Sequence, residues 1–226
     1  MTNPWLRIPA SDYEAHMTLP EVAQAQAIER LFASALIEHA PASLAVFGCS
    51  TGNGFEHIDP LQTRRVVGID INPEYLAILK RRFAAKIPCL EVVEADFTLP
   101  GFRLEPVAMV FAALVFEYVN VHDALQSIER CMTAGAILVA VLQLPSEESA
   151  PVTPTQYKSL DLLAPIMRLV SPDEFSDATA GVGLQELNRE TVSLKMGKAF
   201  FVGCYRKDIE SSSSVDCSEG RLETPQ

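Results

Sequence analysis

The stretch Leu44-Ala-Val-Phe-Gly-Cys-Ser-Thr-Gly-Asn-Gly54, followed by Val66-Val-Gly-Ile-Asp70, decides the fold of this chain. In both stretches a short apolar run ends in turn-forming or polar residues, which is typical of a strand buried on both faces of a parallel sheet. The first strand leads into a glycine-rich loop, and the second ends in Asp70. Loops and side chains at such strand ends form the binding crevice of this kind of sheet.

Helix-like and strand-like segments alternate on both sides of this stretch. Apolar residues at helical spacing predict a helix over 21–39, and Asn72-Pro73 is typical of the start of another, over 74–83. A third helix is predicted at about 121–132, with further strands at 89–93, 107–112 and 136–142. The alternation predicts an α/β fold with a doubly wound, mostly parallel sheet and helices on both faces.

The pattern changes after residue 143. A surface loop is predicted at 145–155, short helices at 157–168 and 172–179, and an antiparallel hairpin from 184–194 and 199–206. The chain thus divides into an N-terminal arm and helix (1–43), a core (44–207) with an insert (145–183), and an acidic tail (208–226). The tail has five acidic residues, one Arg and few apolar residues, so we expect it to be disordered.

Composition limits the classes of function. A length of 226 residues is typical of one domain. The net charge of −11 argues against binding of nucleic acid through its phosphates and against adhesion to anionic membranes. The chain has no apolar run of about 20 residues and no signal-peptide pattern at its start. We therefore expect a cytoplasmic protein, either a monomer or a homodimer.

The five cysteines are odd in number and unevenly spaced, with no C-x-x-C pair. A disulfide framework or a zinc site would need closer or more regular spacing. We therefore expect free thiols and no bound metal.

The sequence of the glycine loop can be compared with several known kinds of loop, and it matches some better than others. A P-loop needs a lysine that this loop lacks, and glycines at 48, 52 and 54 miss the G-x-G-x-x-G spacing of nicotinamide sites. A purely structural loop remains open. Gly48-Cys-Ser-Thr-Gly52 matches the nucleophile elbow G-x-S-x-G, which would make Ser50 a hydrolase nucleophile. The last histidine of the chain, His122, comes too early for the usual order of such a triad.

A nucleoside-binding site would account for residues beyond the loop as well. Asp70 lies 22 residues after Gly48, where a carboxylate can accept hydrogen bonds from both hydroxyls of a ribose. Asp96 follows the third strand, where it could accept a hydrogen bond from an adenine amino group while Phe97 packs on the ring.

From about residue 44 to residue 207 the chain resembles the class I S-adenosylmethionine-dependent methyltransferases. The segments 47–54, 67–70 and 94–97 are similar to that family's glycine motif, ribose-binding acid and adenine-contacting acid, and 110–118 resembles its fourth motif, beside the methyl group. The resemblance implies a seven-stranded sheet of order 3-2-1-4-5-7-6 and S-adenosylmethionine as methyl donor. The cofactor contacts that it implies are Phe47, Gly48, Cys49, Ser50, Gly52, Asn53, Asp70, Ile71, Asp96 and Phe97.

Two positions depart from the family pattern. Val46 stands where the family usually has an acid near the amino group of the cofactor, and Ser50 stands where it usually has a second glycine. A protein that binds S-adenosylmethionine or S-adenosylhomocysteine without catalysis therefore stays open, beside the methyltransferase and the Ser50 hydrolase.

The methyl acceptor is expected to be a small molecule, because only the N-terminal arm and the insert could add to a pocket. Methyl transfer needs donor and acceptor held in line, with a general base only where the acceptor loses a proton. Glu117, Tyr118 and His16 are the catalytic candidates, and Tyr13 and Gln143 are the candidates for acceptor binding. We expect the arm, which carries Tyr13 and His16, to fold over the cofactor as a lid.

Overall fold

The computed structural model describes residues 3–146, 150–195 and 197–209, so most of the predicted disordered tail, from residue 210 on, lies outside the described residues. Within these ranges seven strands form one sheet of order β3-β2-β1-β4-β5-β7-β6, which confirms the predicted order. The strands are β1 (Ser43–Phe47), β2 (Arg65–Asp70), β3 (Leu90–Glu94), β4 (Val107–Ala113), β5 (Met132–Gln143), β6 (Leu184–Ser193) and β7 (Ala199–Lys207).

Strands β1 to β5 run parallel, and β7 pairs antiparallel with both β5 and β6. The register aligns the ends of the central strands, because Phe47 of β1 lies opposite Ile69 of β2 and Ala112 of β4. The loops that follow these strands therefore emerge at one edge of the sheet. The strand order reverses between β1 and β4, the place where ligands bind in doubly wound sheets.

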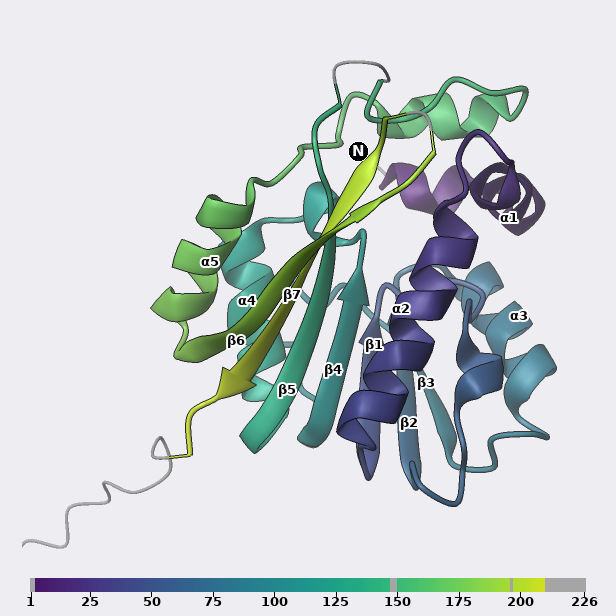
Figure 1. Ribbon diagram of the computed structural model, residues 1–226. Helices are drawn as coiled ribbons and strands as arrows, with labels where there is room; N and C mark the ends of the chain where they lie inside the picture. The colour runs from purple at the N-terminus through teal and green to yellow at the C-terminus, as the bar shows by residue number, and fades with distance from the viewer. Residues whose placement is uncertain (1–2, 147–149, 196, 210–226) are drawn as a thin grey trace, which may run out of the picture.

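Four longer helices cover the two faces of the sheet (Figure 1). One face carries α2 (Gln24–His39) and α3 (Pro73–Phe83), and the other carries α4 (Val121–Arg130) and α5 (Pro172–Gly181). As predicted, α3 begins at Asn72, whose side chain accepts hydrogen bonds from two backbone N–H groups of the first turn. Within the described ranges, no helix is both long and apolar enough to cross a membrane.

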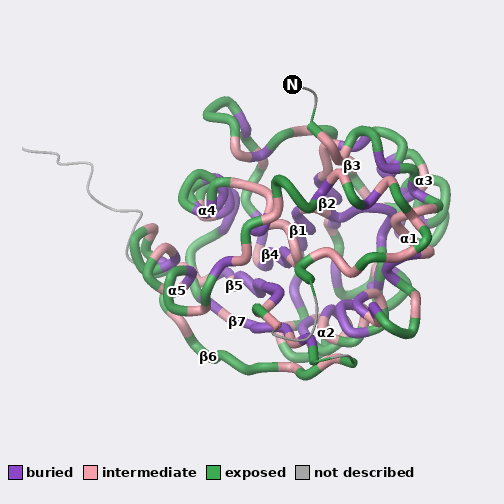
Figure 2. The backbone as a smooth tube through the Cα atoms, turned by 90° about the horizontal axis from the view of Figure 1, so that it is seen from above, coloured by how far each residue is buried: buried purple, intermediate pink, exposed green. Residues whose placement is uncertain are grey.

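Side chains of the central strands are buried on both faces. Leu44 and Val46 of β1 pack with apolar residues of α2 and α3, whereas Ala45 and Phe47 pack with those of α4 and α5. This alternation follows from the two-residue repeat of a strand. Viewed from above, the central strands are buried between the helices and β6 lies exposed at one edge (Figure 2).

The structure corrects one expectation outside the core. The predicted helix over 157–168 is wrong, because only a short 3-10 segment, η4 (Lys158–Leu163), forms there. Pro165 lacks the backbone N–H that would continue the helical hydrogen bonds, which is consistent with the early stop. The N-terminal arm contains two helical segments, η1 (Pro4–Arg7) and α1 (Ala10–Thr18).

These N-terminal elements lie over the carboxyl edge of the sheet, next to η4 (Figure 1). Only Ala10, His16 and Met17 of α1 are buried. The helix α1 and the segment η4 therefore meet above the strand ends, although Lys158 comes 140 residues after Thr18 in the sequence.

We predict that Gly52→Ala destabilises the fold by about 2–5 kcal/mol. Gly52 has φ +91°, and a Cβ there would overlap the side chain of Leu79 and lie 2.9 Å from Phe83 Cε2, both on α3. Gly181→Ala is the control, because nothing lies within 4 Å of its added Cβ and its φ is not positive. Urea unfolding measures both variants, and equal stabilities would contradict this account of the loop.

Candidate functional site

A cleft opens at the carboxyl edge of the sheet, where the strand order reverses. It is lined by residues at or after the ends of β1 to β4, by the N-terminal arm, and by the insert. Six of the ten predicted cofactor residues line it: Gly48, Ser50, Asp70, Ile71, Asp96 and Phe97.

The loop after β1 folds back onto the end of β2. The backbone N–H groups of Gly48 and Cys49 donate to the carbonyl of Ile69, at 2.9 and 3.0 Å. Ser50 adopts φ +49°, a left-handed conformation that costs a residue with a side chain about 1–2 kcal/mol. The chain therefore keeps the glycine-like backbone at this position although the residue is serine.

Asp70 links this loop to the start of α3. Its two carboxylate oxygens accept hydrogen bonds from the backbone N–H groups of Ser50 and Asn72, each at 2.9 Å. Burial raises the pKa of Asp70, and the backbone amides of Asn72, Ser50 and Ile71 oppose that rise by stabilising the anion. The carboxylate is thus held in one orientation at the floor of the cleft.

Asp96 and Phe97 form one side of the cleft beyond β3. Asp96 is exposed, and its Oδ1 accepts from the N–H and the hydroxyl of Thr98, at 3.0 and 2.6 Å. The Phe97 ring is buried and lies edge-on to Phe47, with the ring centres 5.0 Å apart. This packing fixes the position of Phe97 beside Asp96.

The other four predicted cofactor residues do not line the cleft. The side chains of Phe47 and Cys49 are buried in the two apolar clusters. Gly52 packs against α3, and the side-chain amide of Asn53 donates to the carbonyl of Ala25 in α2 at 2.8 Å. All four line a second cavity, between the glycine loop, α2 and α3, which shares Gly48 and Ser50 with the cleft.

The N-terminal arm forms a roof of aromatic rings over the cleft. Tyr13 stacks on Tyr75 of α3, with ring centres 5.5 Å apart, and Trp5 meets Tyr13 and Tyr118 edge-on at 5.9 and 5.0 Å. Trp5, Tyr13, Tyr75 and Tyr118 all line the cleft. A ligand bound at the strand ends would lie beneath them.

Polar contacts fasten this roof to the glycine loop and to α3. The carboxylate of Glu14 accepts from the hydroxyl of Thr51 and forms an ion pair with Arg82. The pKa of Glu14 is lowered chiefly by the hydrogen bond from Arg82. The side-chain amide of Asn72 donates to the carbonyl of Trp5 at 2.9 Å. The arm is therefore bound to the same loops that carry Asp70.

A buried polar network forms the far wall of the cleft. The side chain of Gln143, at the end of β5, accepts from Gln24 of α2 and donates to the carbonyl of Pro151 in the insert, each at 2.8 Å. Its backbone N–H donates to Oε1 of Glu117 at 2.7 Å. Gln143, a predicted acceptor-binding residue, thus already uses both polar side-chain atoms within the protein.

The three predicted catalytic residues lie in different surroundings. Glu117 is 1% exposed and does not line the cleft, and burial raises its pKa to about 7. Tyr118 lines the cleft, but burial raises its pKa, so it stays protonated near neutral pH. His16 also lines the cleft, and burial and the nearby charge of Lys198 lower its pKa. His16 is therefore neutral near pH 7.

Lys198 is a site residue that no sequence motif marks. This residue lines the cleft and is 2% exposed. A lysine in the connection of a hairpin is ordinarily solvated, so its type and position gave no signal. Its burial follows from contacts with the insert, more than 40 residues earlier in the chain.

The four histidines have partners other than Ser50. His16 Nδ1 lies 3.1 Å from the hydroxyl of Thr155 and His57 pairs with Glu29, while His122 and His39 contact Gln126 and Cys204. A serine nucleophile needs a histidine within hydrogen-bond reach. The geometry therefore gives no support to a Ser50 hydrolase.

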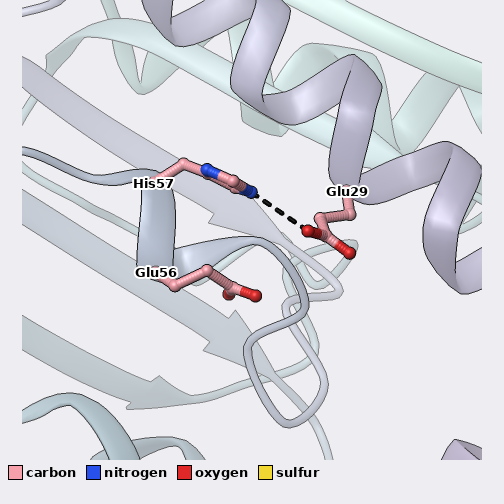
Figure 3. Close-up of side chains that lie close together, drawn as sticks. All are labelled: Glu29, Glu56 and His57. Carbon is pink, nitrogen blue, oxygen red and sulfur yellow. Dashed lines mark hydrogen bonds and ion pairs between the residues drawn. The ribbon is translucent and has the colours of Figure 1, made fainter.

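Within the described ranges, one side-chain group has metal-ligand spacing: Glu29, Glu56 and His57, whose ligand atoms lie within 4.8 Å of one another. His57 points toward Glu29 and pairs with it at 3.1 Å (Figure 3). None of the three residues lines the cleft. The pairing of His57 with Glu29 accounts for this arrangement, and the expectation that no metal is bound stays a prediction.

Comparisons with known proteins agree with the fold. Residues 45–140 match a family model described as a methyltransferase domain. The fold resembles that of the N-methyltransferase NodS from Bradyrhizobium japonicum WM9 in complex with S-adenosylhomocysteine (TM-score 0.63, 14% identity, 81% of this chain and 87% of that chain).

Two further structures are similar to a comparable degree. Geranyl diphosphate C-methyltransferase from Streptomyces coelicolor A3(2) has a TM-score of 0.60 at 14% identity, over 82% of this chain and 83% of that chain. The [4+2]-cyclase SpnF has 0.64 at 14% identity, over 80% and 81%. At these identities the likeness shows the fold. No curated protein matches the sequence.

We predict that the buried carboxyl of Glu117 makes stability fall as pH rises from about 4.5 to about 7. Its folded pKa lies above its ordinary value of 4.5, so the folded state binds the proton more tightly and loses this advantage as pH rises through about 7. The free energy of unfolding of the wild type, relative to Glu117→Gln, should fall by about 2–4 kcal/mol over this range. Glu38→Gln, at an exposed position, is the control, and a difference that does not change with pH would contradict the prediction.

Proposed function

We propose that this chain, whose residues 45–140 match the model of a methyltransferase domain, is a class I methyltransferase that transfers a methyl group from S-adenosylmethionine to a small-molecule acceptor. The observation that carries the proposal is the placement of Asp70 and Asp96 in one cleft beside the glycine loop. A carboxylate fixed by two backbone amides can accept hydrogen bonds from the ribose hydroxyls, and Asp96 can accept one from adenine.

The residues of the cleft act mainly by binding and orientation. S-adenosylmethionine supplies an activated methyl group on a sulfonium. Asp70, Asp96 and the loop of Gly48 and Ser50 would hold the nucleoside, while the aromatic roof excludes water. Because donor and acceptor are already bound in line, most of the entropy that a bimolecular reaction would lose is lost on binding, before the reaction itself.

His16 is the residue best suited to accept a proton from the acceptor. It lines the cleft and is neutral near pH 7, because burial and Lys198 lower its pKa. In the described ranges only its Nδ1 forms a hydrogen bond, to Thr155. Tyr118 is protonated near neutrality and suits the role of a hydrogen-bond donor. Glu117 lies outside the cleft and accepts a hydrogen bond from the backbone N–H of Gln143.

Support for a small acceptor comes from the segments that cover the cleft and from the residues that line it. The N-terminal arm and η4 contact each other and both line the cleft, so a macromolecule would have to displace them to reach the strand ends. Leu160, Leu163 and Met167 give the acceptor side an apolar lining.

The four cysteines in the described part of the chain are free, which suits a reducing compartment such as the cytoplasm.

A protein that binds S-adenosylmethionine without methyl transfer is the second candidate. Val46 is buried among apolar side chains, and the acids lining the cleft are Asp70 and Asp96, both on the nucleoside side. Within the described residues, the cleft thus offers no carboxylate at the position where the family usually binds the cofactor's amino group. Methyl transfer to an acceptor library, followed with labelled S-adenosylmethionine, separates the two candidates.

We predict that Asp70→Asn weakens binding of S-adenosylhomocysteine by about 10–100-fold, because the ribose hydroxyls lose a charged acceptor. Calorimetry with S-adenosylhomocysteine and its 2′-deoxy analogue measures this effect. The wild type should prefer the hydroxylated ligand, and the variant should not. Asp59→Asn, an exposed change outside the cleft, should bind like the wild type. Full affinity in a folded Asp70→Asn protein would refute the site.

We predict that His16→Gln lowers turnover about 100-fold or more with an acceptor found in the library, because the proton acceptor is lost. Affinity for S-adenosylhomocysteine should stay within about twofold, since His16 is assigned to the acceptor side. His122→Gln, at an exposed position on α4, should leave both quantities unchanged. Unchanged turnover in His16→Gln would exclude His16 as the base.

A further inference from the structure

We propose that the ammonium group of Lys198 binds an anionic group, such as a carboxylate, of the methyl acceptor. This inference rests on the proposed function, because it assigns the acceptor to the part of the cleft away from Asp70 and Asp96. It narrows the acceptor from a small molecule to an anionic compound with an apolar body.

The first observation is the burial of a charge whose partners among the described residues are neutral groups. Lys198 is 2% exposed. Its Nζ donates to the hydroxyl of Thr153 at 2.6 Å and to the carbonyl of Pro151 at 3.3 Å, both neutral groups. None of the ion pairs formed by the described residues includes Lys198, although buried charges in proteins are usually paired. An anion arriving in the cleft would give this ammonium an acidic partner.

The second observation is the position of Lys198 in the cleft. It lines the same cleft as Asp70 but is the last residue before β7, and its partners belong to the insert. His16 also lines the cleft, and its Nδ1 lies 3.1 Å from the hydroxyl of Thr155, two residues along the insert from Thr153, which accepts from Lys198. The two groups therefore face the same segment of the insert, and the charge of Lys198 contributes to the lowered pKa of His16. An acceptor bound through its anion to Lys198 would therefore lie within the surroundings of the proposed base.

The third observation is the apolar lining around this ammonium group. Val152, Leu160, Leu163 and Met167 line the cleft on the side of the insert. Leu160 and Leu163 are each 3% exposed and pack with Ile8 of the N-terminal arm. A single cation at the edge of an apolar surface suits a ligand with one anionic group and an apolar body.

The carboxylate of the cofactor is the other possible source of an anion. We favour the acceptor, because the contacts of Lys198 lie on the insert and not on the loops after β1, β2 and β3. The two sources differ in a measurable way. 5′-Methylthioadenosine lacks the amino acid end of S-adenosylhomocysteine, so the ratio of the two affinities reports on that end of the ligand.

The test compares wild type with Lys198→Met in two titrations. Cinnamate and octanoate, each paired with its neutral amide, are titrated into protein saturated with S-adenosylhomocysteine. The wild type should bind the carboxylates about tenfold or more tightly than the amides, and Lys198→Met should lose this preference. Lys198→Arg should keep it, and so should Lys158→Met, which removes an exposed cation near the arm. S-adenosylhomocysteine and 5′-methylthioadenosine should keep their affinity ratio in Lys198→Met.

Three results would overturn the proposal. Equal binding of carboxylates and amides by the loaded wild type would exclude an anion site while leaving the proposed function intact. A loss of preference for S-adenosylhomocysteine over 5′-methylthioadenosine in Lys198→Met would assign the lysine to the cofactor's carboxylate. Failure of the wild type to bind S-adenosylhomocysteine at all would overturn both the proposed function and this inference.

Discussion

The carboxylate of Asp70 is the constraint on which the cleft depends. It accepts one hydrogen bond from the glycine loop, at Ser50, and one from the start of α3, at Asn72. A half-buried carboxylate that lost these amides would be left with fewer hydrogen-bond partners, which is costly. The strained backbone of Ser50 is therefore stabilised from the next strand. The same fixed oxygens are those that would meet a ribose.

The N-terminal arm depends on the same loops. Glu14 joins Thr51 of the glycine loop to Arg82 of α3, and Asn72 donates to the carbonyl of Trp5. The ion pair between Glu14 and Arg82 is partly exposed, where such a pair contributes little to stability. Such a roof can detach locally without unfolding the sheet, which is what the entry and exit of a ligand beneath it require.

The parts of the fold and site that the sequence predicts are those set by local patterns. The apolar runs that end at Phe47 and at Asp70 predicted adjacent buried strands, and Asn72-Pro73 predicted the start of α3. The pleat of β1 turns Phe47 into the core, so the motif alone could not show that its side chain avoids the cleft. The helix α1 has no clear apolar repeat, and its structure depends on packing against distant elements. The burial of Lys198 likewise depends on an insert far away in the chain.

The central claim is that S-adenosylmethionine and its product bind at the carboxyl ends of β1, β2 and β3, beneath the N-terminal arm. Hydrogen exchange of the full chain, with and without saturating S-adenosylhomocysteine, tests it most directly. We predict slower exchange at the amides of residues 48–52, 70–72 and 96–98. Exchange should also slow throughout 3–18, because contacts with the ligand would stabilise the packing of the N-terminal arm. Unchanged exchange in these four segments at saturation, or protection confined to another part of the molecule, would contradict the claim.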